Sequence, residues 1–142
     1  MPRHVVCPKC RAVNRVPDEK PAEKATCGKC HAKLFEGKPV DLDTAAFDVH
    51  ARRNDIPLVV DFWAPWCGPC RAMAPVFDRA AAELEPGARF ARVNVDEEPE
   101  LAQRYNIQGI PALFVFRNGA VAARHAGLID FATLKSWIAT NA

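Results

Sequence analysis

Apolar and polar positions change their period several times along the chain, and these changes mark the expected elements. From residue 58 to residue 63 the side chains are almost continuously apolar and include β-branched and aromatic residues, as in a strand covered on both faces. From residue 67 to residue 85 apolar side chains recur at helical spacing, and Pro86-Gly87 ends the pattern. The two stretches predict a buried strand that runs directly into a long helix.

The rest of residues 39–142 continues this alternation. Shorter apolar runs predict four further strands, at 39–42, 90–95, 112–116 and 121–126. Helical spacing and capping residues predict helices over 43–53, over 99–105 and from 130 onward. Arg117-Asn118-Gly119 is a typical hairpin turn between the last two strands. The order βαβαβαββα predicts an α/β domain with a central mixed β-sheet flanked by helices.

Residues 1–36 have a different character. They show little periodic apolar content and contain two Cys-X-X-Cys pairs sixteen residues apart, formed by Cys7, Cys10, Cys27 and Cys30. This spacing fits a tetrahedral all-thiolate zinc site, in which the metal supplies folding free energy that so small a core lacks. We expect a zinc-binding module over 1–36 with one structural zinc ion, and a larger domain over 37–142. Iron, disulfides or a thiol switch are the alternatives for these sulfurs.

The four histidines add no further site to this picture. His31 directly follows Cys30 and is able to replace it as a ligand, but we expect a surface residue there. His4, His50 and His125 fall in no metal or catalytic pattern, and we expect them to be solvated.

Composition and charge argue against several classes of partner. The net charge is +2, with +5 in residues 1–40 and −3 in residues 41–142, which is too weak for a nucleic-acid-binding protein. No apolar stretch reaches the roughly 18 residues of a membrane span, and the N-terminus has no apolar signal segment. We therefore expect no nucleic acid and no membrane among the partners, and a cytoplasmic location. In that compartment six cysteines serve metal binding or catalysis rather than a disulfide scaffold.

The third pair, Cys67-Gly68-Pro69-Cys70, lies where the buried strand meets the long helix. At the first turn of a helix, unpaired N–H groups and the helix dipole stabilise a thiolate. Thiol–disulfide exchange needs such a thiolate and a second thiol that resolves the mixed disulfide. We predict that Cys67 attacks and that Cys70, one turn later, resolves. A buried disulfide or a further pair of metal ligands is the alternative.

Several residues of the larger domain stand in a characteristic order: Asp61, Trp66-Cys67-Gly68-Pro69-Cys70, Gly109-Ile110-Pro111 and Gly127. In this order they resemble the thioredoxin family, and with the four-cysteine segment the whole chain resembles the zinc-containing thioredoxins of the thioredoxin 2 type. The resemblance implies a thioredoxin fold with a small zinc-ribbon or rubredoxin-like module at the N-terminus. It also implies a protein-disulfide reductase in cell redox homeostasis, recharged by NADPH-dependent thioredoxin reductase and holding no organic cofactor of its own.

The resemblance favours particular roles for two residues near the dithiol. Asp61, a carboxyl group in a buried strand, is either a satisfied buried polar group or a group of raised pKa that accepts the proton of Cys70 through water. The resemblance favours the second role. Arg92 stands where the family often has lysine, and it can offset the charge of Asp61 but cannot donate a proton at neutral pH.

The family also places a docking surface for an extended substrate segment beside the dithiol, with backbone pairing as in β-augmentation. Its expected members are Trp66, Gly109, Ile110, Pro111 and Gly127. The Ile110-Pro111 bond is expected to be cis by resemblance, although an average X-Pro bond is trans. Gly68 permits close backbone approach and Pro69 stiffens the loop, whereas Phe62, Trp63 and Trp137 are expected in the core.

Two other functions remain open from the sequence. One is a zinc-ribbon interaction or redox-sensing protein that uses the thioredoxin-like domain as a docking platform, although the intact Cys67 and Cys70 pair argues against it. The other is an oxidase or isomerase on the same fold. The potential of the dithiol distinguishes it from a reductase, since reductants of this fold lie near −270 mV and strong oxidants near −120 mV.

Overall fold

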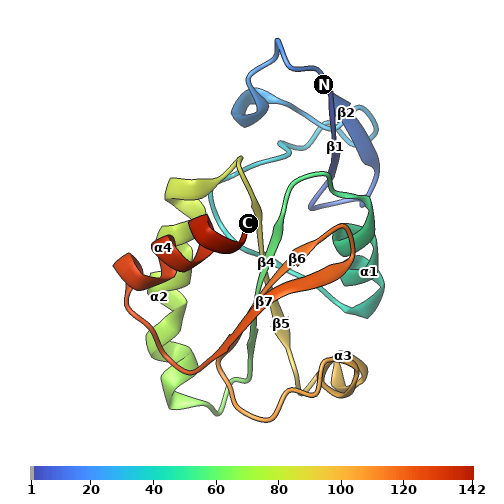
Figure 1. Cartoon of the computed structure of the whole chain (residues 1–142). Coiled ribbons are helices and arrows are strands. Elements are labelled where there is room, and N and C mark those ends of the chain that lie inside the picture. Colours follow the sequence, from blue (N-terminus) through green and yellow to red (C-terminus); the bar gives the residue numbers. More distant parts are fainter. Residues whose placement is uncertain (1) are drawn as a thin grey trace.

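A computed structural model describes residues 2–142, and its larger part is built on a five-stranded sheet of order β3-β5-β4-β6-β7 (Figure 1). The strands are β3 (Val40–Asp41), β4 (Leu58–Trp63), β5 (Arg89–Asn94), β6 (Ala112–Arg117) and β7 (Ala120–Ala126). Strands β3, β5 and β4 are parallel, and β6 and β7 are each antiparallel to their neighbours. The predicted mixed sheet is confirmed.

Four helices cover the two faces of this sheet: α1 (Thr44–Arg53), α2 (Gly68–Leu84), α3 (Pro99–Arg104) and α4 (Phe131–Asn141). Figure 1 shows α1 and α3 on one side and α2 with α4 on the other. Val60 and Phe62 of β4 lie in the core under α1, and Val59 lies in the core under α2. Burial on both faces explains the continuous apolar run of this strand. Among residues 2–142, no helix is both long and apolar enough to cross a membrane.

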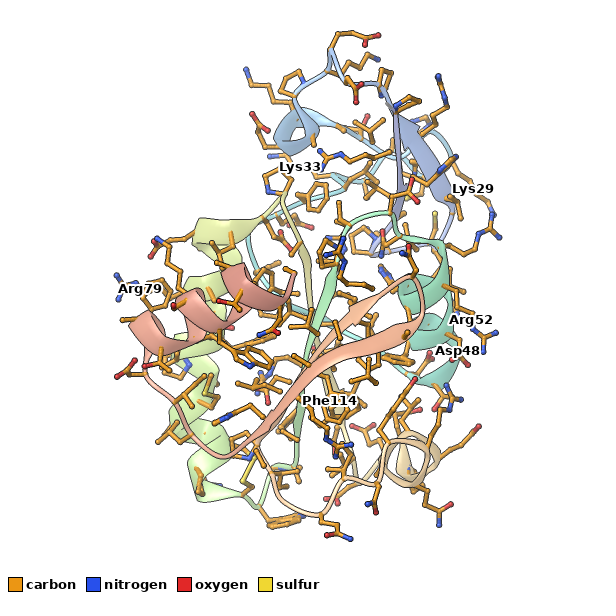
Figure 2. All side chains as sticks on the ribbon, in the orientation of Figure 1. Lys29, Lys33, Asp48, Arg52, Arg79 and Phe114 are labelled. Atoms are coloured by element: carbon orange, nitrogen blue, oxygen red, sulfur yellow. A yellow bond between two sulfur atoms is a disulfide. The ribbon has the colours of Figure 1, made fainter. Side chains whose placement is uncertain are left out.

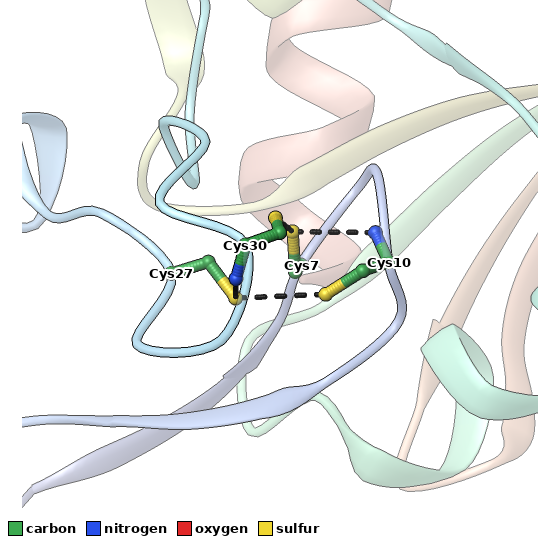
Figure 3. Close-up of side chains that lie close together, drawn as sticks. All are labelled: Cys7, Cys10, Cys27 and Cys30. Carbon is green, nitrogen blue, oxygen red and sulfur yellow. Dashed lines mark hydrogen bonds between the residues drawn. The ribbon is translucent and has the colours of Figure 1, made fainter.

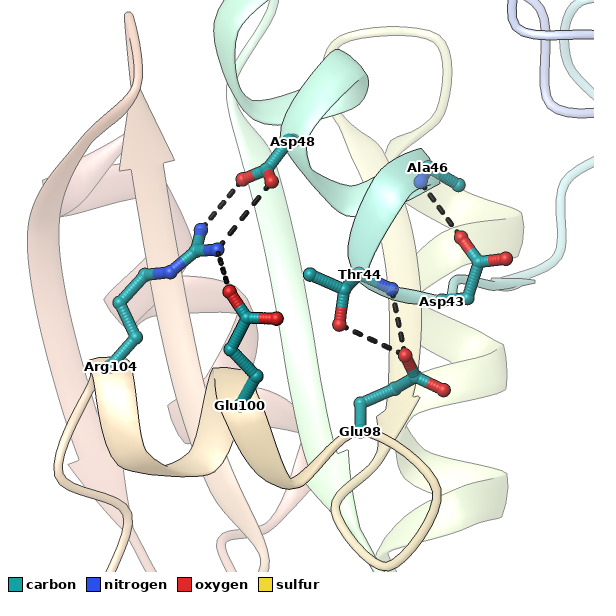
Figure 4. A network of polar contacts seen from close by, with 7 residues as sticks. All are labelled: Asp43, Thr44, Ala46, Asp48, Glu98, Glu100 and Arg104. Atoms are coloured by element: carbon teal, nitrogen blue, oxygen red, sulfur yellow. Dashed lines mark hydrogen bonds and ion pairs between the residues drawn. The ribbon is translucent and has the colours of Figure 1, made fainter.

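Polar contacts fix the start of α1 and join it to α3 (Figure 4). Asp43 caps α1, because its carboxylate accepts a hydrogen bond of 2.8 Å from the backbone N–H three residues later. Glu98, just before α3, accepts bonds from both the N–H and the hydroxyl of Thr44, at 2.8 and 2.9 Å. Arg104 at the end of α3 donates to Asp48 of α1 at 2.6 Å. These contacts position the short helix α3 beside the first helix.

The N-terminal module consists of a hairpin, a short helical turn and two cysteine loops. Strands β1 (Arg3–Val6) and β2 (Val13–Val16) pair antiparallel, and a 3-10 turn, η1 (Ala22–Lys24), precedes the second loop. Its small core includes Val5, Leu34 and Phe35, and Ile56 of the larger part completes that core. The module lies at the end of the sheet where β4 begins, away from the junction of β4 with α2 (Figure 1).

A buried arginine joins the module to the sheet. Arg89, at the start of β5, is 1% exposed, and its Nη2 donates to the carbonyl oxygens of Val6 at 3.0 Å and Leu34 at 2.7 Å. Its guanidinium lies 4.5 Å from the centre of the Phe35 ring, and Nη1 lies 3.7 Å from the carboxylate of Glu85. Because a buried guanidinium is costly without partners, these contacts make the arginine a specific link between the two parts.

The expectation of a solvated His50 is wrong, since this residue is fully buried at the same junction. Its Nδ1 lies 3.0 Å from Nδ2 of Asn54, whose Oδ1 accepts a bond of 2.7 Å from the N–H of Val6. Burial, together with the charges of Arg89 and Arg11, lowers the pKa of His50 to about 3, so the imidazole is neutral. The docking of the module on α1 causes this burial, and the helical pattern of α1 alone does not predict that contact.

The other histidines and aromatic residues divide between surface and core. His4 is exposed, although its Nδ1 lies 3.0 Å from the carboxylate of Asp55, and His125 is half-buried. Phe62 is fully buried as expected, whereas Trp63 and Trp137 are only partly buried at the edges of their clusters.

Candidate active site and metal centre

The pair at the junction of β4 and α2 is joined in a disulfide, with Cα atoms 5.2 Å apart. Cys67 is the N-cap of α2, and its Sγ accepts a bond of 3.1 Å from the N–H of Cys70. Cys67 retains 5% exposure, whereas Cys70 is fully buried. The more accessible sulfur therefore stands at the positive end of a seventeen-residue helix, where a thiolate is stabilised.

The loop before β6 reaches the same sulfur from a distant part of the sequence. The Ile110-Pro111 bond is cis, as the resemblance predicted. The carbonyl oxygen of Ile110 lies 3.7 Å from Sγ of Cys67. Gly127 donates its N–H to the carbonyl of Pro111 at 2.8 Å, with a φ of +102° that favours glycine. The structure thus brings the three segments around residues 67, 110 and 127 together.

The predicted docking residues differ in exposure. Trp66 is 67% exposed, Gly109 is exposed and Ile110 is partly buried, whereas Pro111 is buried. Gly68 and Pro69 lie exposed on the first turn of α2, and among residues 2–142 no atom outside its chain neighbours and the adjacent helix backbone lies within 4 Å of a Cβ built at Gly68. Open space therefore lies next to Gly68 on this turn.

Two further residues belong to this region and were missed in the sequence. Asp96 accepts a bond of 2.9 Å from the indole N–H of Trp66, which fixes the ring beside the dithiol. Leu128, next to Gly127, is a large apolar side chain that is 52% exposed. Asp96 follows the carboxyl end of β5, and the carboxyl ends of parallel strands share one edge of a sheet. The position of Asp96 just after a strand is therefore the sequence signal that points to this residue.

Asp61 lies in the middle of β4 and is fully buried, opposite Arg92 of β5. Burial raises the pKa of its carboxyl group to about 7, and the nearby charge of Arg92 opposes the rise. Among residues 2–142 neither oxygen of Asp61 has a hydrogen-bond partner, while the Arg92 guanidinium stacks 4.6 Å from the centre of the Trp63 ring. A carboxyl group that titrates near neutrality suits proton exchange.

The four N-terminal cysteines converge on one point (Figure 3). Their sulfur atoms all lie within 4.8 Å of one another, with Sγ of Cys7 3.6 Å from that of Cys30 and Sγ of Cys10 3.6 Å from that of Cys27. Four ligands at about 2.3 Å around a tetrahedral zinc stand about 3.8 Å apart. The donor set and its spacing therefore fit zinc.

Both cysteine loops have the same internal construction. Sγ of Cys7 accepts bonds from the N–H groups two and three residues later, at 3.4 and 3.5 Å, and Sγ of Cys27 does so at 3.3 and 3.5 Å. Burial raises the pKa of the Cys7 thiol. His31 is exposed and lies outside the cluster of four sulfurs. Four thiolates close the coordination sphere of zinc.

The fold and the Cys67–Cys70 pair at the start of α2 define a thiol–disulfide oxidoreductase. A family model described as Thioredoxin matches residues 38–140, and a model described as Thioredoxin 2, N-terminal, a zinc ribbon, matches residues 6–32. The chain belongs to the thioredoxin family. It is 36% identical to thioredoxin C-3 of Corynebacterium nephridii, over 94% of this chain and 92% of that protein. It is 41% identical to a thioredoxin of Porphyra purpurea, over 65% of this chain and 86% of that protein.

Proposed function

We propose that the chain reduces disulfide bonds of protein substrates, with Cys67 as nucleophile and Cys70 as resolving thiol. The thiolate of Cys67 attacks one sulfur of the substrate disulfide, which breaks that bond, releases one substrate thiolate and leaves a mixed disulfide. Cys70 then loses its proton, attacks Sγ of Cys67 and releases the second thiolate. The substrate gains two electrons, and the chain ends with the Cys67–Cys70 disulfide. The position of Cys67 at the N-cap of α2, with more exposure than Cys70, is the observation that carries this assignment.

The neighbouring residues have supporting roles in this proposal. Asp61, through water, accepts the proton of Cys70, because a carboxyl group with a pKa of about 7 exchanges protons readily at neutral pH. Trp66, Gly109, Ile110, Pro111 and Gly127 form the docking surface for the substrate segment. Gly68 and Pro69 shape the turn that presents the attacking sulfur.

The N-terminal module has a structural role in this proposal. Residues 1–36 form a domain in which Cys7, Cys10, Cys27 and Cys30 hold one zinc ion per chain, and residues 37–142 form the catalytic domain. A four-thiolate zinc site has no open position for a substrate. When bound, zinc supplies folding free energy to the module rather than chemistry to the reaction.

The partners of the reaction follow from the family. Thioredoxin reductase, which takes electrons from NADPH, restores the dithiol, so the chain carries electrons from the reductase to its substrates in the cytoplasm. The relatives that support this assignment are themselves described as thioredoxins. Their names do not specify a substrate.

Trapping of the mixed disulfide tests the assignment. Cys70→Ser should accumulate client proteins joined to Cys67 by bonds that a reductant cleaves, whereas Cys67→Ser should trap none and lose disulfide reduction. If disulfide reduction survives in Cys67→Ser and Cys70→Ser captures no client, the enzymatic roles are wrong. The docking-platform function would then explain the chain better.

A further inference from the structure

A hollow of about 260 Å³ adjoins the docking surface. It lies between the loop that precedes the cis proline and strand β7. Gly109 and Ala126 line it, and these residues directly precede Ile110 and Gly127 of the docking surface. The hollow is therefore a continuation of the surface on which a substrate segment would lie.

The floor of the hollow is apolar and a single arginine stands over it. Ala112 and the ring of Phe114, both buried residues of β6, line this floor; Figure 2 labels Phe114 on the sheet. Arg124 is the cross-strand partner of Phe114, and its guanidinium lies 4.6 Å from the centre of that ring. Its Nη2 also donates to the carbonyl oxygen of Asn106 at 3.4 Å. These two contacts hold the guanidinium at the edge of the hollow.

The charge of the hollow is positive and uncompensated. No carboxylate of the described part of the chain lines it, and none lies within ion-pair distance of Arg124. His125 also borders the hollow, but its ring contacts Trp137 of α4 on the other face of the sheet. The guanidinium uses one of its five N–H donors here, which leaves a fork suited to a carboxylate.

We propose that Arg124 binds a carboxylate side chain, Glu or Asp, of the substrate segment and so favours acidic substrate sequences. The proposal rests on the proposed function, since it requires a segment docked beside Cys67. Strand residues advance about 3.4 Å each, so Arg124 lies about 7 Å along β7 from Ala126. An extended segment that pairs with Ile110 reaches this distance about two to four residues from its reacting cysteine. An aliphatic stem on the apolar floor with a carboxylate at the fork matches a glutamate.

Matched peptides test this specificity. Each peptide carries the same disulfide, with Glu or Gln placed two to four residues from the cysteine that Cys67 attacks. We expect the unaltered chain to reduce the best-placed Glu peptide with a kcat/KM about tenfold above that of its Gln counterpart, mainly through KM. Arg124→Gln should abolish this preference and leave the Gln peptide unaffected, and Arg124→Lys should retain part of it. Added salt should weaken the preference.

Control reactions separate this proposal from the assignment of the dithiol. Arg117→Gln removes the same charge at the other end of the β6–β7 hairpin and should keep the preference. Reduction of a small aromatic disulfide should be equal in all variants, which also reports that they fold. If the unaltered chain reduces the Glu and Gln peptides equally, or if Arg124→Gln keeps the preference, the acidic subsite is refuted while the reductase stands. Failure to reduce any disulfide would instead refute both.

Discussion

Replacement of Asp61 by Asn should stabilise the oxidised protein at neutral and alkaline pH. The carboxyl group is fully buried without a hydrogen-bond partner among residues 2–142, and burial is the main cause of its raised pKa. The folded state thus holds the proton of Asp61 more tightly than the unfolded state does. This stabilisation is complete below about pH 4 and is lost as the pH rises through about 7. The variant has no proton to lose at this position.

The pKa shift sets the size of the effect. The pKa of Asp61 rises from 3.8 to about 7, a difference of about 3 units. At about 1.4 kcal/mol per unit, ionisation of the folded protein costs about 4 kcal/mol once the pH is well above 7. The free energy of unfolding of Asp61→Asn should exceed that of the unaltered protein by nearly this amount at about pH 8. Near pH 4 the two proteins should be about equally stable, since both then bury a neutral group.

Denaturant unfolding of the oxidised proteins between about pH 4 and about pH 8 measures this difference, and the disulfide keeps Cys67 and Cys70 from titrating. Glu85, whose pKa burial also raises to about 7, is present in both proteins and cancels in the comparison. Asp41→Asn, at an exposed position of β3, controls for the loss of a negative charge and should change stability little. A stability difference that stays constant with pH, or an unaltered protein that is the more stable at pH 8, would refute the reasoning.

Further predictions concern the N-terminal module and the indole of Trp66. Arg89→Met leaves buried Glu85 without its cation and should lower the free energy of unfolding by about 3–5 kcal/mol in denaturant titrations. Arg79→Met breaks an exposed Arg–Glu pair that is also four residues apart in sequence, and it should have little effect. After zinc chelation, proteases should cleave the N-terminal module before they cleave the larger domain, and peptide mapping measures this order. Asp96→Asn weakens the bond to the Trp66 indole and should lower kcat/KM for protein disulfides about threefold, with unchanged reduction of small disulfides.

Elements with a strong local pattern were predictable from the sequence. Interactions between residues close in sequence are sufficient to define three such features. These are the apolar run of β4, the capping aspartates of α1 and α4, and the turn before β7. Asn118 and Gly119 both take positive φ, at 53° and 82°, as this hairpin turn requires. The dithiol was also predictable, because a Cys-X-X-Cys pair between a strand and a helix has few alternatives.

Contacts between the two parts of the chain were not predictable in this way. His50 and Arg89 are polar residues whose burial depends on the docked module, and no local period reports that contact. Arg89 finds its carbonyl partners at Val6 and Leu34, respectively 83 and 55 residues away in sequence. Arg124 presents the same difficulty, since its relation to the docking surface depends on the pairing of β7 with β6.

The three Cys-X-X-Cys motifs share one local turn, so the motif itself does not choose between metal binding and redox chemistry. In each motif the first Sγ accepts a bond from the N–H of the second cysteine, at 3.5, 3.5 and 3.1 Å. In each, the next residue, Arg11, His31 or Arg71, donates its N–H to the carbonyl of the first cysteine. Arg11 and His31 have φ of 66° and 67°, and the chain turns back there, whereas α2 continues through Arg71. The reversal lets the two N-terminal pairs face each other, as a four-thiolate metal site requires. The continuing helix places the third pair at the positive end of the α2 dipole.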